Sequence, residues 1–455
     1  MNPGATIINK IKSMLFSRQM RWFEAVLVCI ILLGFYFYQS RIAPFHPDEA
    51  DWIATSDAFE AFLTGGINAA LWQESYWTLT QPPVSRYWTG LGRNLGGYRL
   101  KDLKTLWVDQ ETYGRINRFS TSNLTQRMLL WSRLAMAVLS ALSAFIIFYL
   151  CFKVSGRLSG YLVALLFMGS NFFSQLLPRA MGEAPLLAAV MAAWFAGYRA
   201  VQSWEQAIWD STPVRRRGIV RSLIWFGLMG FFCGIAGASK MNGASITLGA
   251  GLLAVATPLV RRGNGDKAFR LRFMILSGGL LAISAAIGFI GPNPYLYPDI
   301  LGRTSRMLDN RFTEMEQQLQ ENPDDAISTP GERISAISFY VLQDSTVLRF
   351  PTGRFINLAF CLAGAAFIVI KVWKWLGDRR SPASESNVAS VVTLAIAVTA
   401  SAPVLFTLIN WNRYYMVPTV FAMVCIAVGM TWTIKVLLSR LTRPVDTLWQ
   451  PEHHQ

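Results

Sequence analysis

The sequence predicts an all-α polytopic membrane protein, and three observations support this fold class. Of the 455 residues, 53% are hydrophobic and only 15% are charged, which is too apolar for an ordinary soluble domain. Apolar runs long enough to cross a bilayer as helices recur along the whole chain. The net charge of +15 comes from short basic runs between these segments, as in cytoplasmic loops, and this pattern argues against nucleic acid as a partner.

We expect ten membrane spans of roughly 18 to 25 mostly apolar residues each. The first run follows a basic N-terminus and is interpreted as a retained signal anchor, because it is as long as a spanning helix and lacks a small-residue cleavage site. The apolar stretch 222–260 is divided in two at Lys240-Met241-Asn242-Gly243. The predicted spans are 22–39, 128–152, 158–177, 183–200, 222–240, 243–260, 273–291, 354–373, 390–409 and 414–438.

Basic residues predict the orientation of these spans. If the N-terminus is cytoplasmic, every inside segment carries Lys or Arg, from Lys10 to Arg443, whereas the short outside connections 178–182 and 410–413 hold one arginine each. The positive-inside rule therefore predicts that both termini lie in the cytoplasm. We expect the chain to be a multi-pass protein of the cell (inner) membrane. We expect one transmembrane domain over 1–438, followed by a cytoplasmic tail, 439–455.

Two long loops then lie on the outside, at about 40–127 and about 292–353. In the first loop, apolar and aromatic residues at helical spacing between Asp48 and Leu71 predict an amphipathic helix at the membrane interface. The second loop contains a polar helix candidate, Ile300 to Gln320, which breaks at Asn322-Pro323-Asp324-Asp325.

The sequence His46-Pro47-Asp48-Glu49 places two adjacent carboxylates just beyond the first span. A carboxylate there can act as a general base that takes the proton from an acceptor hydroxyl or amine as it attacks a sugar carbon. We assign this role to Asp48, and we expect its partly apolar surroundings to raise its basicity. The alternative is that Asp48 or Glu49 caps the interfacial helix, and both roles can coexist across the pair.

Two further motifs fall at outer membrane boundaries. In Gln81-Pro82-Pro83-Val84-Ser85-Arg86, the two prolines fix a turn that aims Gln81 and Arg86, although such a turn can also simply begin a helix. Arg179 and Glu183 lie four residues apart, a spacing that suits an ion pair, but the carboxylate could instead orient the arginine toward a ligand phosphate.

Lys240 and Arg413 end their spans on the same outer side. Each could bind a phosphate, or it could extend toward lipid headgroups as an anchor. Arg413-Tyr414-Tyr415 joins a bidentate donor to two aromatic rings able to cover a lipid or a sugar.

The histidines give no metal site, because His453 and His454 fall in the tail and leave only His46 outside. A cation held by Asp48, Glu49 and Asp51 is conceivable, but the calcium-loop spacing is missing. We therefore expect no required cofactor, with a divalent cation left open.

Taken together, these motifs resemble the C-type (GT-C) glycosyltransferases, in the branch of protein O-mannosyltransferases and the aminoarabinose transferases that modify lipid A. The resemblance covers about 40–260 well and the last span more loosely. It rests on Asp48-Glu49, on Gln81-Pro82-Pro83-Val84-Ser85-Arg86 where the family often has His-Pro-Pro-Leu-Gly-Lys, on Arg133-Leu134-Ala135, Gly156-Arg157, Arg179 followed by Glu183, Lys240-Met241-Asn242-Gly243 and Arg413-Tyr414-Tyr415-Met416-Val417-Pro418.

The resemblance implies a GT-C fold, a polyprenyl-phosphate-linked sugar donor and an inverting transfer on the extracytoplasmic face, with Asp48 as base and without an obligatory metal. Gln81 stands where the family often has His and Glu183 where it usually has Asp, so we expect the donor sugar or its contacts to differ from those of the family. The acceptor, whether lipid, glycan or protein, is not identified. The predicted site comprises Asp48 and Glu49 as catalytic residues and His46, Gln81, Arg86, Arg179, Glu183, Lys240, Arg413, Tyr414 and Tyr415 as substrate-binding residues.

Two other classes of function compete with a glycosyltransferase. Transporters and lipid flippases tend to bury ionisable residues at mid-membrane and often contain inverted repeats. In this chain the ionisable residues lie at span ends and the two halves do not match, which argues against transport. A structural scaffold would leave the ordered outside motifs without a purpose.

Overall fold

The computed structural model describes residues 18–66, 70–103, 123–210, 212–261, 263, 266–344, 346, 350, 352–378 and 381–441. The predicted tail residues His453 and His454 lie outside these ranges. Within them the chain is built of helices, and the one extended pairing is an isolated bridge between Ala326 and Ile409. The predicted all-α polytopic fold is confirmed.

Nine helical segments of the described chain are long and apolar enough to cross a membrane, and each overlaps one predicted span. A helix satisfies its own backbone hydrogen bonds, as the hydrocarbon interior requires. The helices that form these segments are α2 (Arg18–Ile42), α9 (Asn123–Ser155), α12 (Glu183–Ala207), α13 (Thr212–Ser239), α14 (Ile246–Val260), α15 (Lys267–Ile290), α18 (Gly353–Gly377), α19 (Glu385–Ser401) and α20 (Met416–Leu441).

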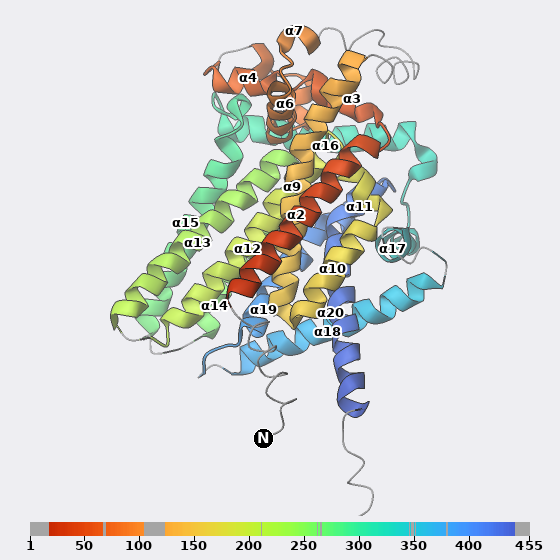
Figure 1. Cartoon of the computed structure of the whole chain (residues 1–455). Helices are drawn as coiled ribbons and strands as arrows, with labels where there is room; N and C mark the ends of the chain where they lie inside the picture. The colour runs from red at the N-terminus through yellow and green to blue at the C-terminus, as the bar shows by residue number, and fades with distance from the viewer. Residues whose placement is uncertain are drawn as a thin grey trace, which may run out of the picture.

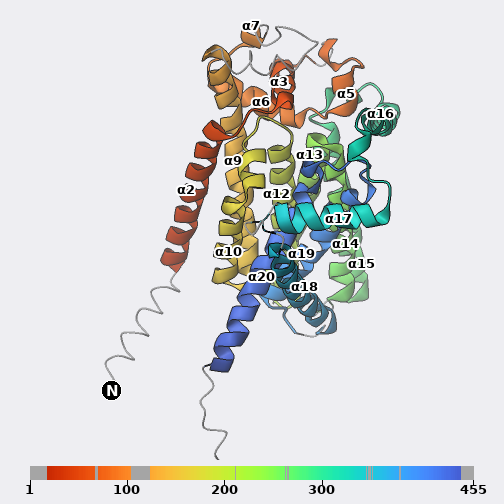
Figure 2. The ribbon, with the colours of Figure 1, turned by 90° about the vertical axis from the view of Figure 1, so that its right-hand side faces the viewer.

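The prediction of one continuous helix over 158–177 is wrong. The segment consists of α10 (Arg157–Gly169) and α11 (Asn171–Leu176), which follow each other along the bundle in Figure 1. Ser170 has an extended backbone, and its side chain accepts a hydrogen bond from the Phe173 N–H at 3.4 Å, so it starts a new helix. The start of α2 and the end of α20 lie at the same end of the bundle (Figures 1 and 2).

The predicted division of 222–260 is confirmed. Helix α13 ends at Ser239, Lys240 has an extended backbone, and a 3-10 turn, η3 (Met241–Ser245), leads into α14. Lys240 therefore lies in the break between two helices and not within a helical turn.

Helix α12 forms the centre of the bundle, with 83% of its most apolar window buried. Its Trp194 and Trp204 are fully buried, and alanines between them let neighbouring helices approach. Close approach recurs between α13 and α15, where a Cβ added at Gly230 would lie 2.2 Å from the Leu281 carbonyl oxygen. This packing holds the first residue of α12, Glu183, on a rigid support.

Short helices of the first loop cover one end of the bundle, and we call them the cap (Figures 1 and 2). The single interfacial helix predicted between Asp48 and Leu71 is two helices, because the Thr55 and Ser56 hydroxyls donate to the carbonyls of Asp51 and Ile53 and end the first one. The cap consists of α3 (Pro47–Ala54), α4 (Ala58–Leu63), η1 (Ala70–Trp72), α5 (Tyr76–Thr80), α6 (Val84–Leu95) and α7 (Leu100–Leu103).

The second loop lies against the same end of the bundle. The predicted polar helix is confirmed as α16 (Ile300–Glu321), and the predicted break is the short turn η5 (Pro323–Asp325). Figure 2 shows α17 (Pro330–Phe339) lying across the side of the bundle below α16. The remaining elements are η4 (Pro294–Leu296), the π-helical η6 (Tyr340–Asp344), η7 (Ala402–Phe406) and η8 (Asn412–Tyr415).

Candidate active site

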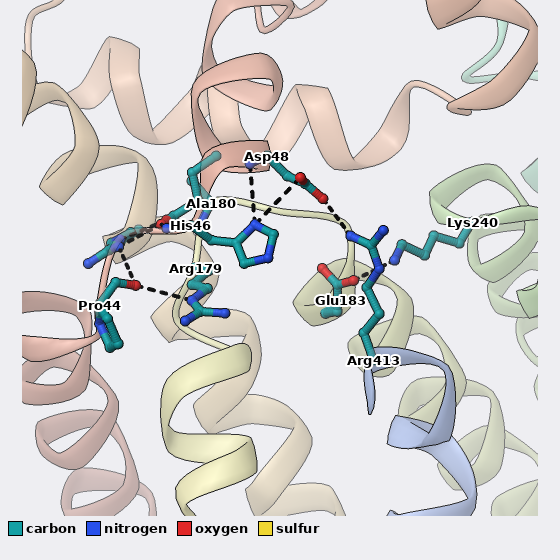
Figure 3. A network of polar contacts seen from close by, with 10 residues as sticks. Pro44, His46, Asp48, Arg179, Ala180, Glu183, Lys240 and Arg413 are labelled. Carbon is teal, nitrogen blue, oxygen red and sulfur yellow. Dashed lines mark hydrogen bonds and ion pairs between the residues drawn. The ribbon is translucent and has the colours of Figure 1, made fainter. Parts of the chain in front are cut away.

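Charged side chains from five separate segments meet between the cap and the bundle (Figure 3). The segments are the start of α3, the turn before α12, the start of α12, the residue after α13, and η8. We call the resulting group the charged cluster, and it consists of Asp48, Arg179, Glu183, Lys240 and Arg413.

Asp48 is paired with Arg413. The Arg413 Nη1 donates to the Asp48 Oδ2 at 2.5 Å, a charge-assisted contact. Burial favours the neutral form of the Asp48 carboxyl, but the charge of Arg413 and the hydrogen bond that it donates outweigh burial, so the pKa of Asp48 is lowered. The expectation that apolar surroundings raise the basicity of Asp48 is therefore wrong.

His46 and Glu49 form the cap of helix α3. The His46 Nδ1 accepts from the Asp48 N–H at 3.2 Å, and the Glu49 Oε2 accepts from the His46 N–H at 3.0 Å. Burial lowers the pKa of His46, and the accepting Nδ1 carries no proton. His46 and Glu49 thus provide the capping hydrogen bonds of α3. The side chain of Asp48 is not needed for the cap and faces Arg413.

Glu49 faces the bundle interior, where it binds Arg133. The Arg133 Nε and Nη2 donate to its two carboxylate oxygens at 2.7 and 2.6 Å, and the Ala180 N–H donates to Oε1 at 2.9 Å. Both Glu49 and Arg133 are almost fully buried. We therefore interpret Glu49 as a positioning residue that fixes α3 to α9. Arg133 belongs to a motif of the sequence, but its pairing with Glu49 was not predicted. An arginine inside an apolar span needs a buried partner, and this was the signal that could have revealed the pair.

Glu183 pairs with Lys240 and not with Arg179. The Lys240 Nζ donates to the Glu183 Oε1 at 2.5 Å, while the second oxygen of this buried carboxylate has no hydrogen-bond partner in the described chain. The predicted pairing of Arg179 with Glu183 does not form, because Arg179 precedes α12, where helical spacing does not apply.

Arg179 donates from its Nε to the Pro44 carbonyl oxygen at 3.2 Å, and no carboxylate of the described chain lies within ion-pair distance of it. Burial lowers the pKa of Arg179, against the opposing charge of Glu49. The charged cluster therefore contains three cations (Arg179, Lys240, Arg413) against two carboxylates (Asp48, Glu183), an excess of one positive charge.

Of the two predicted tyrosines, only Tyr414 lies beside the cluster. The Arg413 guanidinium lies over the rings of Trp411 and Tyr414, 4.8 and 5.9 Å from their centroids, and these two rings are stacked. Tyr415 is buried, with its hydroxyl donating to the Asn410 Oδ1 and its ring stacked on Tyr340. Sequence reasoning missed Trp411, an aromatic residue two positions before Arg413.

Gln81 and Arg86 belong to the inside of the cap. Arg86 is 1% exposed, and its Nη2 donates to the carbonyl oxygens of Gln81 at 3.0 Å and Trp77 at 3.5 Å, so the di-proline turn closes over it. Burial lowers the pKa of Arg86 to about 10. The neighbouring Ser85 is closer to the cluster, since its hydroxyl donates to the Ser239 carbonyl oxygen beside Lys240.

The second loop holds the turn that carries Arg413. The Trp411 Nε1 donates to the Asp325 Oδ2 at 3.1 Å, and the Arg311 Nη2 contacts the Tyr414 hydroxyl at 3.2 Å. Arg311 is in turn bound by Glu314, which also accepts from the Tyr76 hydroxyl of the cap at 2.9 Å. These contacts join both outer loops to η8.

The described residues contain no group of three or more His, Cys, Asp and Glu side chains arranged to hold a metal ion. Asp48 and Glu49, two residues of the conceivable cation site, face different arginines. That the protein requires no metal stays a prediction.

Comparison with known proteins gives one family match. Residues 71–289 match the model of the dolichyl-phosphate-mannose-protein mannosyltransferase family. No curated protein sequence matches the chain.

Several solved structures are similar. The apo structure of ArnT from Cupriavidus metallidurans is 16% identical, with a TM-score of 0.51 over 96% of this chain and 67% of that one. The S. cerevisiae Pmt1-Pmt2 complex bound to the sugar donor is 18% identical, with a TM-score of 0.37 over 60% of this chain and 33% of that one. The apo oligosaccharyltransferase of Archaeoglobus fulgidus is 12% identical, with a TM-score of 0.45 over 92% and 51%.

The chain thus spans a third of the Pmt1-Pmt2 chain and about two thirds of ArnT. The likeness to ArnT shows a shared fold, and the family match covers the segment that carries α9 to α15. The family match agrees with the resemblance predicted from the sequence over residues 71–289, just under half of the chain, and the likeness to ArnT extends the shared fold over nearly all of it.

Proposed function

We propose that this protein, with its GT-C fold, is a membrane glycosyltransferase that moves a sugar from a polyprenyl-phosphate-linked donor to an acceptor hydroxyl or amine. The observation that carries the proposal is the Asp48–Arg413 pair beside Lys240 and Arg179. Here a carboxylate lies together with several cations of the kind that bind phosphate, which supports the proposal. The family match adds support, because the description of that family names dolichyl-phosphate mannose, a sugar linked to a polyprenyl phosphate.

The charge of the cluster favours a monophosphate-linked donor. A sugar joined to a polyprenyl monophosphate is a phosphodiester with one negative charge. The cluster has an excess of one positive charge, so such a donor would leave it neutral, whereas a pyrophosphate would leave a net negative site. Arg179, which has no carboxylate partner in the described chain, is available to the phosphate without breaking an ion pair.

Donor binding would also activate the base. When the donor phosphate accepts hydrogen bonds from Arg413, Asp48 loses the cation that lowers its pKa, and burial then makes the carboxylate more basic. Asp48 takes the proton of the acceptor as the acceptor oxygen or nitrogen bonds to the anomeric carbon. The bond between that carbon and the phosphate oxygen breaks, its electron pair stays on the phosphate, and Lys240 and Arg413 stabilise the charge. Attack opposite the leaving group inverts the anomeric centre.

The roles of the remaining predicted residues follow from their contacts. His46 and Glu49 hold Asp48 in place, and Glu183 orients Lys240. Tyr414 and Trp411 offer aromatic faces to the sugar or the prenyl chain. Gln81 and Arg86 support the cap from within. The acceptor is a lipid, a glycan or a protein, and the site faces the extracytoplasmic side of the cell membrane with both termini in the cytoplasm.

The test is to incubate purified full-length protein in nanodiscs with a panel of radiolabelled polyprenyl-phosphate sugars and membrane extract as acceptor source. We expect one monophosphate donor to be consumed, with free polyprenyl phosphate released and the anomeric centre inverted. The proposal would be overturned if no donor of the panel transferred its labelled sugar to an acceptor. A transporter or flippase would leave the sugar–phosphate bond of every donor intact.

A further inference from the structure

A groove separate from the charged cluster opens on the surface of the bundle between α2 and α9. It has a volume of about 630 Å³, within the range of about 300–1,000 Å³ that is typical of small-molecule sites. Gly34 and Phe37 of α2 and Trp131 and Val138 of α9 line it, and it contains no residue of the charged cluster. We call it the α2–α9 groove.

The groove runs along α2. From Gly34 to Arg41, it follows two turns of α2, or about 10 Å at 1.5 Å per residue. Leu95 of α6, a cap helix, lines it as well, so the cap lies over its upper end. Elsewhere α2 packs on the bundle through the buried Leu32 and Tyr36. The space between the helices is therefore a trough in a packed interface and suits a narrow chain laid lengthwise.

One cation stands at the capped end of this trough. Arg41 is the only charged residue among those that line it. Its side chain is exposed, and no carboxylate of the described chain lies within ion-pair distance. An arginine that ends a membrane helix beside an apolar trough matches an anionic headgroup joined to an alkyl chain, since guanidinium groups bind phosphate with two N–H groups.

We propose that the α2–α9 groove binds one anionic phospholipid of the surrounding bilayer, with an acyl chain against Phe37, Trp131 and Val138 and its phosphate on Arg41. The inference does not depend on the proposed transferase activity. It has a structural consequence, because Arg41 lies three residues before Pro44, whose carbonyl oxygen accepts from Arg133 and Arg179. A bound lipid would steady the segment that leads from α2 into the site.

The experiment uses the full chain in phosphatidylcholine nanodiscs doped with phosphatidylglycerol that carries a photoreactive diazirine on one acyl chain. Mass spectrometry then maps the labelled peptides. We expect labelling concentrated on 34–41 and 131–138. Gly34→Leu fills the trough and should reduce this labelling at least fivefold. Gly278→Leu on α15 is the matched control, because an added Cβ meets nothing within 4 Å at either glycine.

A second pair of variants tests the headgroup. Arg41→Gln should abolish the preference of the groove for phosphatidylglycerol over a diazirine phosphatidylcholine, whereas Arg306→Gln, an exposed arginine of α16 at the same end, should retain it. Val138→Trp provides an independent filling variant if Gly34→Leu fails to fold, which its thermal unfolding curve would report.

Three outcomes overturn the proposal. One is equal labelling of the Gly34→Leu and Gly278→Leu proteins. Another is labelling spread evenly over the lipid-facing helices of the wild type. The third is displacement of the label by polyprenyl phosphate at equimolar concentration, which would assign the groove to the donor chain.

Discussion

Arg413 Nη1 lies 2.5 Å from Asp48 Oδ2, although the two residues are 365 positions apart in the chain. The contact ties the residue that we propose as base to a residue that we propose as phosphate ligand. Each satisfies the other in the absence of donor, so neither charge is left unpaired at the membrane boundary. Binding of phosphate and release of the base then become one event, and the next two predictions depend on this relationship.

Asp48→Asn should abolish transfer while the protein still folds and binds donor. The amide keeps the shape of the side chain and can accept a hydrogen bond from Arg413, but it cannot take the proton. We expect turnover to fall by about a hundredfold to ten-thousandfold, the contribution typical of a general base. Turnover of the purified variant within about threefold of wild type, with donor binding intact, would remove Asp48 as base. Glu74→Gln, which changes an exposed carboxylate in the cap, is the matched control.

Replacing Lys240, Arg413 or Arg179 should weaken donor binding. A charge-assisted hydrogen bond contributes about 1.5–3 kcal/mol, which corresponds to about a tenfold to hundredfold rise in Kd. Titration of a polyprenyl-phosphate sugar into purified Lys240→Ala, Arg413→Ala and Arg179→Gln proteins measures it, with Arg306→Gln as control. Unchanged affinity in the Lys240 and Arg413 variants would mean that these residues are lipid anchors.

Glu49→Gln should destabilise the protein more than Asp48→Asn does. It leaves the buried Arg133 without its carboxylate, and breaking a buried pair costs about 3–5 kcal/mol, whereas Asp48 is partly exposed. Thermal unfolding in detergent compares the two variants. A double variant, Glu49→Gln with Arg133→Met, should lose less than the sum of the single losses. Equal melting temperatures for Glu49→Gln and Asp48→Asn would contradict the positioning role.

The cap of α3 should make stability pH-dependent through His46. Burial lowers the pKa of His46 below 6.5, so the folded state favours the neutral ring that caps the helix. The unfolded chain binds this proton more readily, so the stabilisation is present above pH 6.5 and is lost as pH falls below it. His46→Asn keeps a capping acceptor that does not titrate. Its melting temperature should change less than that of wild type between pH 7 and pH 5, and identical slopes would exclude His46 as the titrating group.

Cysteine accessibility tests the orientation in the membrane. A cysteine engineered at Ser328, in the second loop, should react with an impermeant reagent in intact cells, and one at Ser384, just before α19, should not. The reagent should spare the native cysteines, all of which fall inside apolar segments. Labelling at Ser384 with none at Ser328 would invert the predicted orientation.

The spans were predictable because length and apolarity are local properties of the chain. The division after Ser239 and the polar helix α16 were found for the same reason. The break at Ser170 was missed, since one serine hardly changes the hydropathy of a long window while its side chain can still cap a new helix. Local patterns thus identify the elements and miss interruptions that depend on a single hydrogen bond.

The residues of the site were easier to predict than their partners. Sequence position placed Asp48, Glu183, Lys240 and Arg413 at the same membrane boundary, and the structure brings them together. Which cation meets which carboxylate depends on how the helices pack, and the spacing of Arg179 and Glu183 indicated the wrong pair. The burial of Arg86 depends on a turn folding over it, which no motif reveals.

The bonds between the second loop and η8 bear on how such a protein could be re-engineered. Asp325 binds Trp411 through its side chain, and its backbone carbonyl accepts from Asn410 at 2.8 Å, directly before the turn that presents Arg413. A loop grafted from another protein without an acid at this position would loosen the guanidinium from its place over the aromatic pair. Chimaeras built to change the acceptor therefore need to exchange the second loop and residues 410–415 as one cassette.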